Sequence, residues 1–197
     1  ARAKAEGAGC VVISAKIESE IAVLPAADQK DYLEAVGLAE PGLNRVIREF
    51  FARRDVLEVE TPLLCRSTAT DPLLQSFAVP SGRDTLFLQT SPEFPMKRLL
   101  AAGSGPIYQL GKAFRCEETS RLHNPEFTLL EWYRVGWDHH RLMVEVGEII
   151  RGALALVARP IAVRTLSYGE LFLEYTGLDP HACDEAALRT PLAEIAI

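Results

Sequence analysis

The sequence predicts an α+β fold in which helices flank an antiparallel sheet. Three observations support this prediction: an amphipathic helical pattern over residues 43–54, apolar strand patterns over 106–115 and 127–135, and a long helical pattern over 139–157. A polar loop separates the two strand patterns, as expected of a strand that returns beside its neighbour. Helices and strands in this order are typical of α+β domains.

The N-terminal part is predicted to contain a strand followed by two helices. Residues 9–17 form an apolar run with β-branched side chains, which predicts a buried strand. Pro25 and Asp28 indicate a helix start, because acidic residues favour the first turn. The apolar residues of 43–51 then recur at intervals of three and four. This spacing predicts a strongly amphipathic helix that ends near Arg54.

Shorter patterns predict the remaining elements. Residues 56–64 alternate as a strand as far as Pro62, which suits the end or the edge of a strand. The other segments are a loop or irregular strand pair over 70–84, a strand over 85–88, a helix over 92–102 and further helices after residue 167.

Composition excludes several classes of protein. The chain has 197 residues, of which 48% are hydrophobic and 24% are charged, so it is not disordered or collagenous. No apolar run reaches about 18 residues, and residues 1–9 lack the apolar stretch of a secretory signal. We therefore expect no membrane association. The absence of an initial Met, and an apolar stretch that runs to Ile197, suggest a piece of something longer.

Charge and cysteine usage narrow the function classes further. The net charge of −6 argues against a protein that coats DNA, but a nucleotide site needs only a few arginines. The four cysteines lie far apart and form no C-x-x-C pair. This pattern indicates neither a zinc ribbon nor a disulfide framework, and it predicts a cytoplasmic location.

Residues 114–133 hold the greatest density of reactive side chains. Arg115, at the end of the first strand, can direct its guanidinium at a phosphate. His123 on the following loop can reach further phosphate oxygens. Phe127 offers a flat face for an adenine ring, since stacking of a base on an aromatic ring contributes about 1–3 kcal/mol.

Glu131 and Tyr133 alternate on the returning strand and therefore share one of its faces. A carboxylate beside a phenol can hold an ammonium group. The spacing leaves a second interpretation open, in which this is a solvated hairpin loop whose charges pair only with one another.

The amino-acid sequences of these segments resemble those of a known family. FRCEE and RLHNPEFTLLEWY are similar to motif 2 of class II aminoacyl-tRNA synthetases in its lysine-type form. VLEVETPLL resembles motif 1, with Pro62 at the position of that motif's proline, and LQTSPEFPMKRLL resembles the amino-acid-binding segment. The stretches TSPE, AAGSGPIYQL and LEWYR look most like the elongation factor P–lysine ligases, lysyl-tRNA synthetase paralogues without an anticodon-binding barrel. The resemblance runs from about Leu43 to the end and is most specific over 57–133.

The resemblance implies an ATP site on motif 2. Arg115 would bind the α-phosphate and the amino acid carboxylate, and it is the expected catalytic residue. Glu117 would lie by the adenine, with Phe127 stacked on the ring. His123 and Asn124 would lie along the phosphates and the ribose.

The resemblance also implies an amino acid site. Ser91 and Glu93 would contact the amino acid, with Glu93 at its α-amino group, and Glu131 and Tyr133 would read a lysine-like side-chain amine. Related sequences usually have Asn where this chain has Cys116, so we expect a modest local change without loss of ATP binding.

The implied reaction is ATP-dependent activation of lysine or a lysine-like amino acid as an aminoacyl-adenylate, with transfer to elongation factor P or to tRNA. A homodimer through motif 1 is also implied. The family's Gly-rich motif 3, with its γ-phosphate arginine, has no match here, and the acidic Mg²⁺ ligands belong to that part. We therefore expect no metal site in this chain, which would carry roughly the first half of the catalytic domain and be inactive alone. ATP–pyrophosphate exchange by the purified chain would contradict this expectation.

Residues 9–48 resemble a different family, the Obg-like P-loop ATPases. SAKIE is similar to the last guanine-site loop of that fold, and LAEPGLNRVIR to the linker that follows. The phosphate-binding G-x-x-x-x-G-K-[ST] loop is absent, so no nucleotide should bind this part. The resemblances divide the chain into residues 1–48 and 49–197, with a join near Arg48. The join is either a fused or misassembled gene fragment or a real fusion of two translation-linked modules.

Three alternatives remain at this stage. A lysyl-tRNA synthetase would need an oligonucleotide-binding barrel upstream, for which residues 1–48 are too short. A non-catalytic paralogue could keep the adenylate pockets without the reaction. A structural remnant would not fold stably, and cooperative thermal unfolding would argue against it.

Overall fold

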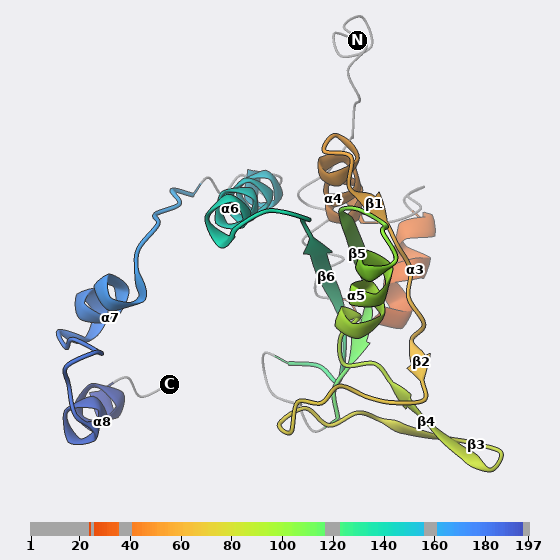
Figure 1. Ribbon diagram of the computed structural model, residues 1–197. Coiled ribbons are helices and arrows are strands. Elements are labelled where there is room, and N and C mark those ends of the chain that lie inside the picture. Colours follow the sequence, from red (N-terminus) through yellow and green to blue (C-terminus); the bar gives the residue numbers. More distant parts are fainter. Residues whose placement is uncertain (1–23, 25, 36–40, 117–122, 156–160, 195–197) are drawn as a thin grey trace, which may run out of the picture. The chain divides into compact units, whose positions relative to one another are not determined.

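The computed structural model describes residues 24, 26–35, 41–116, 123–155 and 161–194 (Figure 1). They belong to two compact units, residues 1–160 and residues 161–197. The strand predicted over 9–17 lies outside the described residues. In the described part, no helix combines the length and the apolar character needed to cross a membrane.

The two helices predicted before residue 55 are both present. Helix α3 (Ala26–Ala35) has Asp28 in its first turn, as the acidic pattern predicted. Helix α4 (Gly42–Ala52) matches the amphipathic segment, and its inner face buries Ile47 and Phe51.

Phe51 is the centre of the apolar core. Its side chain is fully buried and joins a cluster with Ile47, Val56 and Tyr108. The ring stacks on Tyr108 with 4.4 Å between ring centroids, and the ring of Trp132 lies 5.7 Å away. Because Tyr108 and Trp132 come from neighbouring strands, this cluster fixes α4 against one face of the sheet.

The larger sheet has the order β1-β5-β6, from β1 (Leu57–Glu58), β5 (Ile107–Phe114) and β6 (Glu126–Tyr133). Strands β5 and β6 are antiparallel over eight residue pairs, as the returning strand predicted. Strand β1 instead runs parallel to β5, with Leu57 beside Ile107. This pairing differs from the antiparallel expectation, because alternation in a sequence does not encode the direction of a distant partner.

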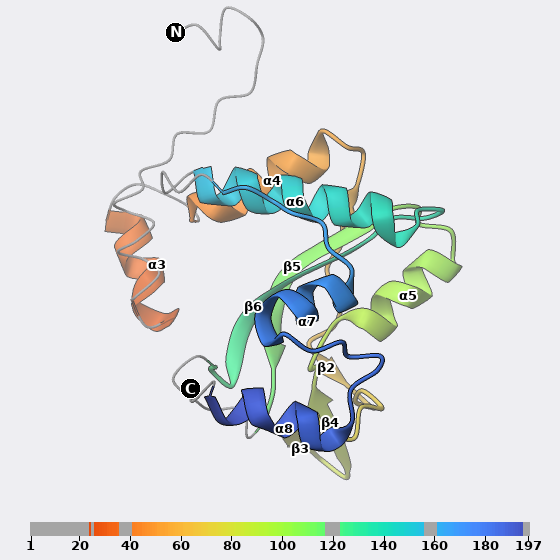
Figure 2. The same ribbon diagram turned by 90° about the vertical axis from the view of Figure 1, so that its left-hand side faces the viewer.

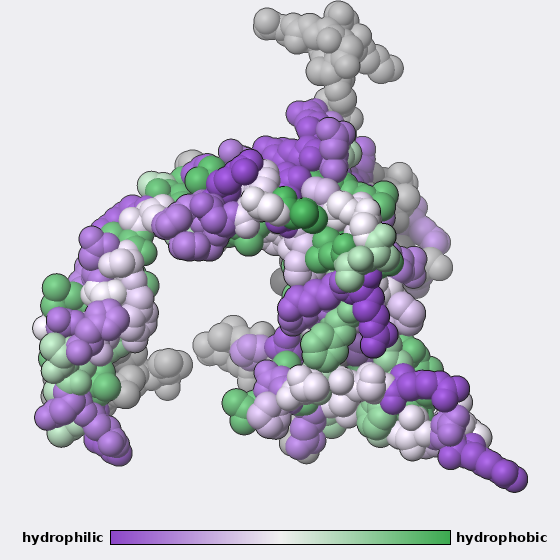
Figure 3. Space-filling view, in the orientation of Figure 1, coloured by the Kyte–Doolittle hydropathy of each residue, from purple (hydrophilic) through white to green (hydrophobic). Residues whose placement is uncertain are grey.

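The smaller sheet is antiparallel, with the order β2-β4-β3. Its strands are β2 (Leu64–Cys65), β3 (Ala78–Ser81) and β4 (Asp84–Leu88). The strand predicted over 56–64 is therefore divided, since its two ends pair in different sheets. Figure 3 shows hydrophilic residues at the tip of the β3–β4 hairpin, where Gly82 forms the turn with φ of +62°.

Helices cover one face of the β5–β6 pair. Helix α6 (His139–Ala155) packs beside α4 (Figure 2), and its Ile149 joins the core on the side of Tyr108 and Trp132. Helix α5 (Glu93–Ala101) follows β4 and begins after Pro92. Both helices match the predicted segments.

The second unit contains α7 (Tyr168–Thr176) and α8 (Glu185–Glu194). A capping box begins α7, because the Ser167 hydroxyl accepts from the Glu170 amide and the Glu170 carboxylate accepts from the Ser167 amide. Gly177 ends the helix in the left-handed conformation with φ of +71°, which glycine adopts without strain.

Candidate functional site

The predicted site residues of β6 share the sheet face that is turned away from α4. Side chains alternate along a strand, so Phe127, Glu131 and Tyr133 point to one face, whereas Trp132 points to the core. At about 3.4 Å per residue, Phe127 and Glu131 are separated by about 14 Å along the strand. We call the end of this face at Phe127 the aromatic end and the end at Glu131 the acidic end.

At the acidic end, Glu131 is held by two hydroxyl groups. Ser91 Oγ donates to one carboxylate oxygen at 2.9 Å, and Tyr133 Oη donates to the other at 2.7 Å. Ser91 Oγ in turn accepts from the Glu93 amide at 3.1 Å. These contacts tie the segment before α5 to β6 and bring together the four residues predicted to bind the amino acid.

The acidic end keeps the Tyr133 phenol protonated. Burial raises the pKa of Tyr133 well above its ordinary value, and the hydrogen bond to Glu131 and the charges of Glu131 and Glu93 raise it further. At neutral pH the phenol is therefore a hydrogen-bond donor to the Glu131 carboxylate. A carboxylate oriented in this way can accept hydrogen bonds from an ammonium group.

Lys97 is a residue of this end that the sequence analysis missed. Its ammonium lies 2.5 Å from the Glu93 carboxylate, four residues earlier on α5. The Glu-x-x-x-Lys spacing on a predicted helix was the available signal. A substrate α-amino group at Glu93 would share this carboxylate with Lys97.

Gln109 is a second residue that the sequence analysis missed, and it lies beside Glu131 on the neighbouring strand β5. It lies opposite Glu131 in the sheet register and is 3% exposed. Its side-chain oxygen accepts from the Thr61 amide at 3.0 Å, and its amide group lies over Gly111, where a Cβ would approach within 3.2 Å. No local pattern could have shown this role, because the contacts come from distant segments.

At the aromatic end, Arg115 and Phe127 lie together. The Arg115 amide donates to the Pro125 carbonyl at 2.9 Å and continues the β5–β6 pairing. The guanidinium carbon lies 5.1 Å from the centroid of the Phe127 ring, within cation–π range. This end thus places a cation and a flat aromatic ring side by side.

Cys116 continues the backbone from this end into a separate loop. Its amide donates to the Gln75 carbonyl at 2.8 Å, and its thiol is free. Because this contact joins main-chain atoms, it does not depend on whether residue 116 is Cys, as here, or Asn, as is usual in related sequences.

The remaining predicted residues are Glu117, His123, Asn124 and Pro62. Glu117 lies outside the described residues. His123 and Asn124 are exposed ahead of β6, and Pro62 is exposed between β1 and β2. Among the described residues, no three His, Cys, Asp or Glu side chains gather as a metal site.

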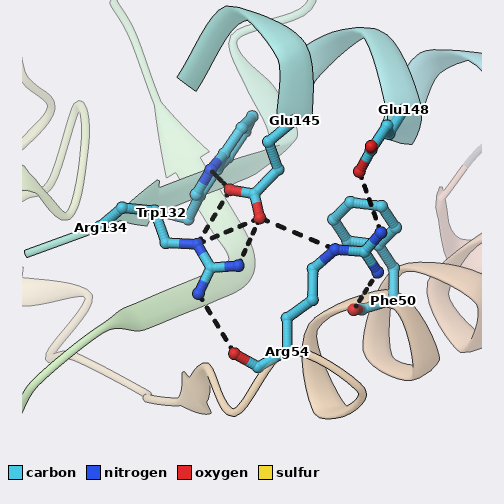
Figure 4. A network of polar contacts seen from close by, with 6 residues as sticks. All are labelled: Phe50, Arg54, Trp132, Arg134, Glu145 and Glu148. Atoms are coloured by element: carbon cyan, nitrogen blue, oxygen red, sulfur yellow. Dashed lines mark hydrogen bonds and ion pairs between the residues drawn. The ribbon is translucent and has the colours of Figure 1, made fainter. Parts of the chain in front are cut away.

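A larger polar network lies behind β6, on the face turned toward α6 (Figure 4). The carboxylate of Glu145 on α6 accepts from the Trp132 indole at 3.0 Å and from the Arg134 guanidinium. Arg54, just after α4, donates to Glu148 at 3.0 Å. The sequence analysis did not predict the pairing of Arg134 with Glu145.

Comparisons with known proteins identify a family for most of the chain. Residues 36–182 match the sequence profile of the tRNA synthetases class II (D, K and N). The chain is 50% identical over 155 residues to proteins named elongation factor P–(R)-β-lysine ligase from Yersinia pestis (strain Pestoides F) and Yersinia pseudotuberculosis (serotype O:1b, strain IP 31758). Each match covers 76% of this chain and 46% of the relative, so the chain spans about half the length of these curated relatives.

Proposed function

Since this chain belongs to the tRNA synthetases class II (D, K and N), we propose that it provides the ATP site and the amino acid site of a lysine-type ligase. The ligase would form an aminoacyl-adenylate of lysine or a lysine-like amino acid. The acceptor we propose is a lysine of elongation factor P, in keeping with the name of the two Yersinia relatives.

One observation carries the amino acid part of this proposal: Glu131 is oriented by Ser91 and Tyr133 on the face of β6 that is turned away from α4. A substrate ammonium at this carboxylate gains charge-assisted hydrogen bonds. An uncharged analogue of the same length would leave the carboxylate without that partner, which is how a polar site rejects an apolar ligand.

The aromatic end supports the nucleotide part. Phe127 provides a stacking face for adenine, and Arg115 provides a planar cation for the α-phosphate and the carboxylate. The two ends lie on one face of the same strand pair, so a molecule with a base at one end and an amine at the other can contact both.

The proposed chemistry needs no side-chain nucleophile. The amino acid carboxylate attacks the α-phosphorus of ATP, and pyrophosphate leaves. The acceptor amine then attacks the acyl carbon of the adenylate, the bond to AMP breaks, and AMP and a proton are released. Arg115 would hold the two reacting anions together and offset the negative charge that develops at the phosphorus. Mg²⁺, when bound, would neutralise phosphate charge.

Two further parts of the proposal rest on the family alone. We propose a homodimer in which the segment around Pro62 lies at the interface, as the resemblance to motif 1 implies. We also propose a cytoplasmic location, where ATP, amino acids and the translation machinery are present.

Calorimetric titration of the chain tests the amine-reading role. L-lysine and (R)-β-lysine should bind more tightly than norleucine, which lacks the side-chain amine. Glu131→Gln should weaken lysine binding by about 1.5–3 kcal/mol, the contribution of a hydrogen bond to a charged group, whereas Glu148→Gln on α6 should not. Equal affinity for lysine and norleucine would contradict the proposal.

A further inference from the structure

The geometry points to Glu145 of α6 as the positioning residue of the Glu131–Tyr133 pair, although it lies on the opposite side of β6. The role of this pair in binding a substrate amine rests on the proposed function. The positioning itself rests on the contacts of the described residues.

Glu145 is a buried carboxylate that contacts two side chains of β6 and its end. Its side chain is 3% exposed, and that of its partner Arg134 is 6% exposed. One carboxylate accepts from Trp132 Nε1 at 3.0 Å and from Arg134 Nε at 3.0 and 3.1 Å, and Arg134 Nη2 also donates to it. A buried ion pair with this many hydrogen bonds fixes both partners in one geometry.

Trp132 links this carboxylate to the site face. It stands between Glu131 and Tyr133 in the sequence, and successive side chains of a strand point to opposite faces. The hydrogen bond from the indole to α6 therefore fixes the orientation of the β6 backbone at Trp132. Glu131 and Tyr133 project from the same stretch of backbone toward the opposite face. A rotation of the strand at Trp132 would move both site residues together.

Arg134 extends the anchor to a third element. Its Nη1 donates to the Arg54 carbonyl at 3.2 Å, in the turn after α4. The guanidinium also lies over the Trp137 ring, at 4.5 Å from the centroid. The end of β6 is thus held by α6 and by the α4–β1 turn at once (Figure 4).

Glu148 provides a comparison on the same helix, at a more exposed position. It lies three residues after Glu145 and accepts from Arg54 at 3.0 Å, but its recorded contacts do not include β6. The loss of Glu148 removes a partly exposed ion pair between α6 and Arg54, whereas the loss of Glu145 removes the buried contact with β6. If Glu145 positions the strand, only its loss should displace Tyr133.

The test reads the Tyr133 hydroxyl directly, without any ligand. In the chain labelled with [¹³Cζ]tyrosine, the Tyr133 signal is identified among the five tyrosines by Tyr133→Phe. Its chemical shift reports the hydrogen bond to Glu131, and Glu131→Gln gives the size of the change when that carboxylate is lost. We expect Glu145→Met to move the Tyr133 signal by a comparable amount, and Glu148→Met to leave it in place.

A double variant separates positioning from stability. Replacing both buried partners, in Arg134→Met/Glu145→Met, removes the uncompensated guanidinium that the single variant leaves, so the thermal unfolding midpoint should recover most of the loss. The Trp132 indole still lacks its acceptor, so the Tyr133 signal should stay displaced. A Tyr133 signal at its wild-type position in the double variant, or an equal shift in Glu148→Met, would overturn the inference.

This outcome is distinguishable from failure of the proposed function. A chain that fails to discriminate lysine from norleucine would still show the displaced Tyr133 signal if Glu145 positions the strand. Conversely, the Glu145 variants could bind lysine selectively and show the Tyr133 signal at its wild-type position. That result would reject the positioning role and leave the proposed function in place.

Discussion

Two tyrosines, the buried Tyr108 of the core and the partly buried Tyr133 of the site, make the stability of the fold depend on pH. Tyr108 donates to Glu58 at 2.9 Å, and Tyr133 donates to Glu131 at 2.7 Å. In both cases burial is the largest cause of a raised pKa, followed by the bond to the carboxylate. Both phenols therefore remain protonated in the folded chain at pH values where a free tyrosine ionises.

This raised pKa predicts a loss of stability in alkali. An unfolded tyrosine loses its proton near pH 10, whereas the folded groups retain theirs, so the unfolded state binds fewer protons and stability falls as pH rises. The contribution is complete below about pH 10 and is lost as pH rises through the folded pKa values. Urea unfolding from pH 8 upward should show a midpoint that declines above about pH 10.

Variants identify the groups responsible for this decline. Tyr108→Phe and Tyr133→Phe should each flatten the dependence on pH, because the ionising group is removed. Tyr175→Phe, whose side chain is exposed, should leave the slope as it is. A slope unchanged in all three variants would show that other groups cause the decline.

At the scale of elements, the capping box of α7 is the clearest local device. Ser167→Ala removes the acceptor of the Glu170 amide and should cost about 1 kcal/mol of helix stability. Amide hydrogen exchange across α7 should then accelerate about fivefold. Exchange in α8 should not change, and equal acceleration in both helices would argue against a local cap.

The cap also predicts acid sensitivity of α7. The Ser167 amide lowers the pKa of Glu170, so the stabilisation is present above the ordinary carboxyl pKa and is lost as pH falls through the folded value. Protection of α7 amides should therefore decrease in acid below about pH 4. Glu170→Gln should remove this dependence on pH, and a variant that keeps it would contradict the assignment.

Helices were more predictable than sheet pairings, for a physical reason. The apolar spacing of α4 and α6 is local and encodes the buried face directly. The pairing of β1 with β5 joins residues about fifty positions apart, and alternation states neither partner nor direction.

The site divides in the same way. Glu131 and Tyr133 share a face because the strand period is two, so the sequence predicted their proximity. Gln109 and Glu145 act through contacts with distant segments, and neither lies in a pattern that indicates a role. The predicted roles of His123 and of Pro62 remain predictions, because no ligand or partner chain tests them.

At the scale of the molecule, stability depends on the cluster around Phe51. The ring is fully buried between α4 and the sheet, and it stacks on Tyr108. Phe51→Ala should therefore lower the free energy of unfolding of the chain by about 3–5 kcal/mol. Leu73→Ala, at a side chain that is 87% exposed, should change it by less than about 0.5 kcal/mol in the same urea titration.

Two results of the urea titration would contradict a single cooperative core around Phe51. Equal effects at Phe51 and Leu73 would mean that the core around α4 does not dominate stability. A gradual rather than cooperative transition in the wild-type chain would favour the structural remnant over a folded unit.

The central claim is that one face of β5–β6 binds a base at Phe127 and an amine at Glu131. Calorimetry with a lysyl-adenylate analogue, in which a sulfamate replaces the phosphate, tests it most directly. The analogue should bind more tightly than either lysine or ATP, because one molecule contacts both ends. Phe127→Ala and Glu131→Gln should each weaken its binding. An analogue that binds no more tightly than ATP, or that is insensitive to either variant, would contradict the claim.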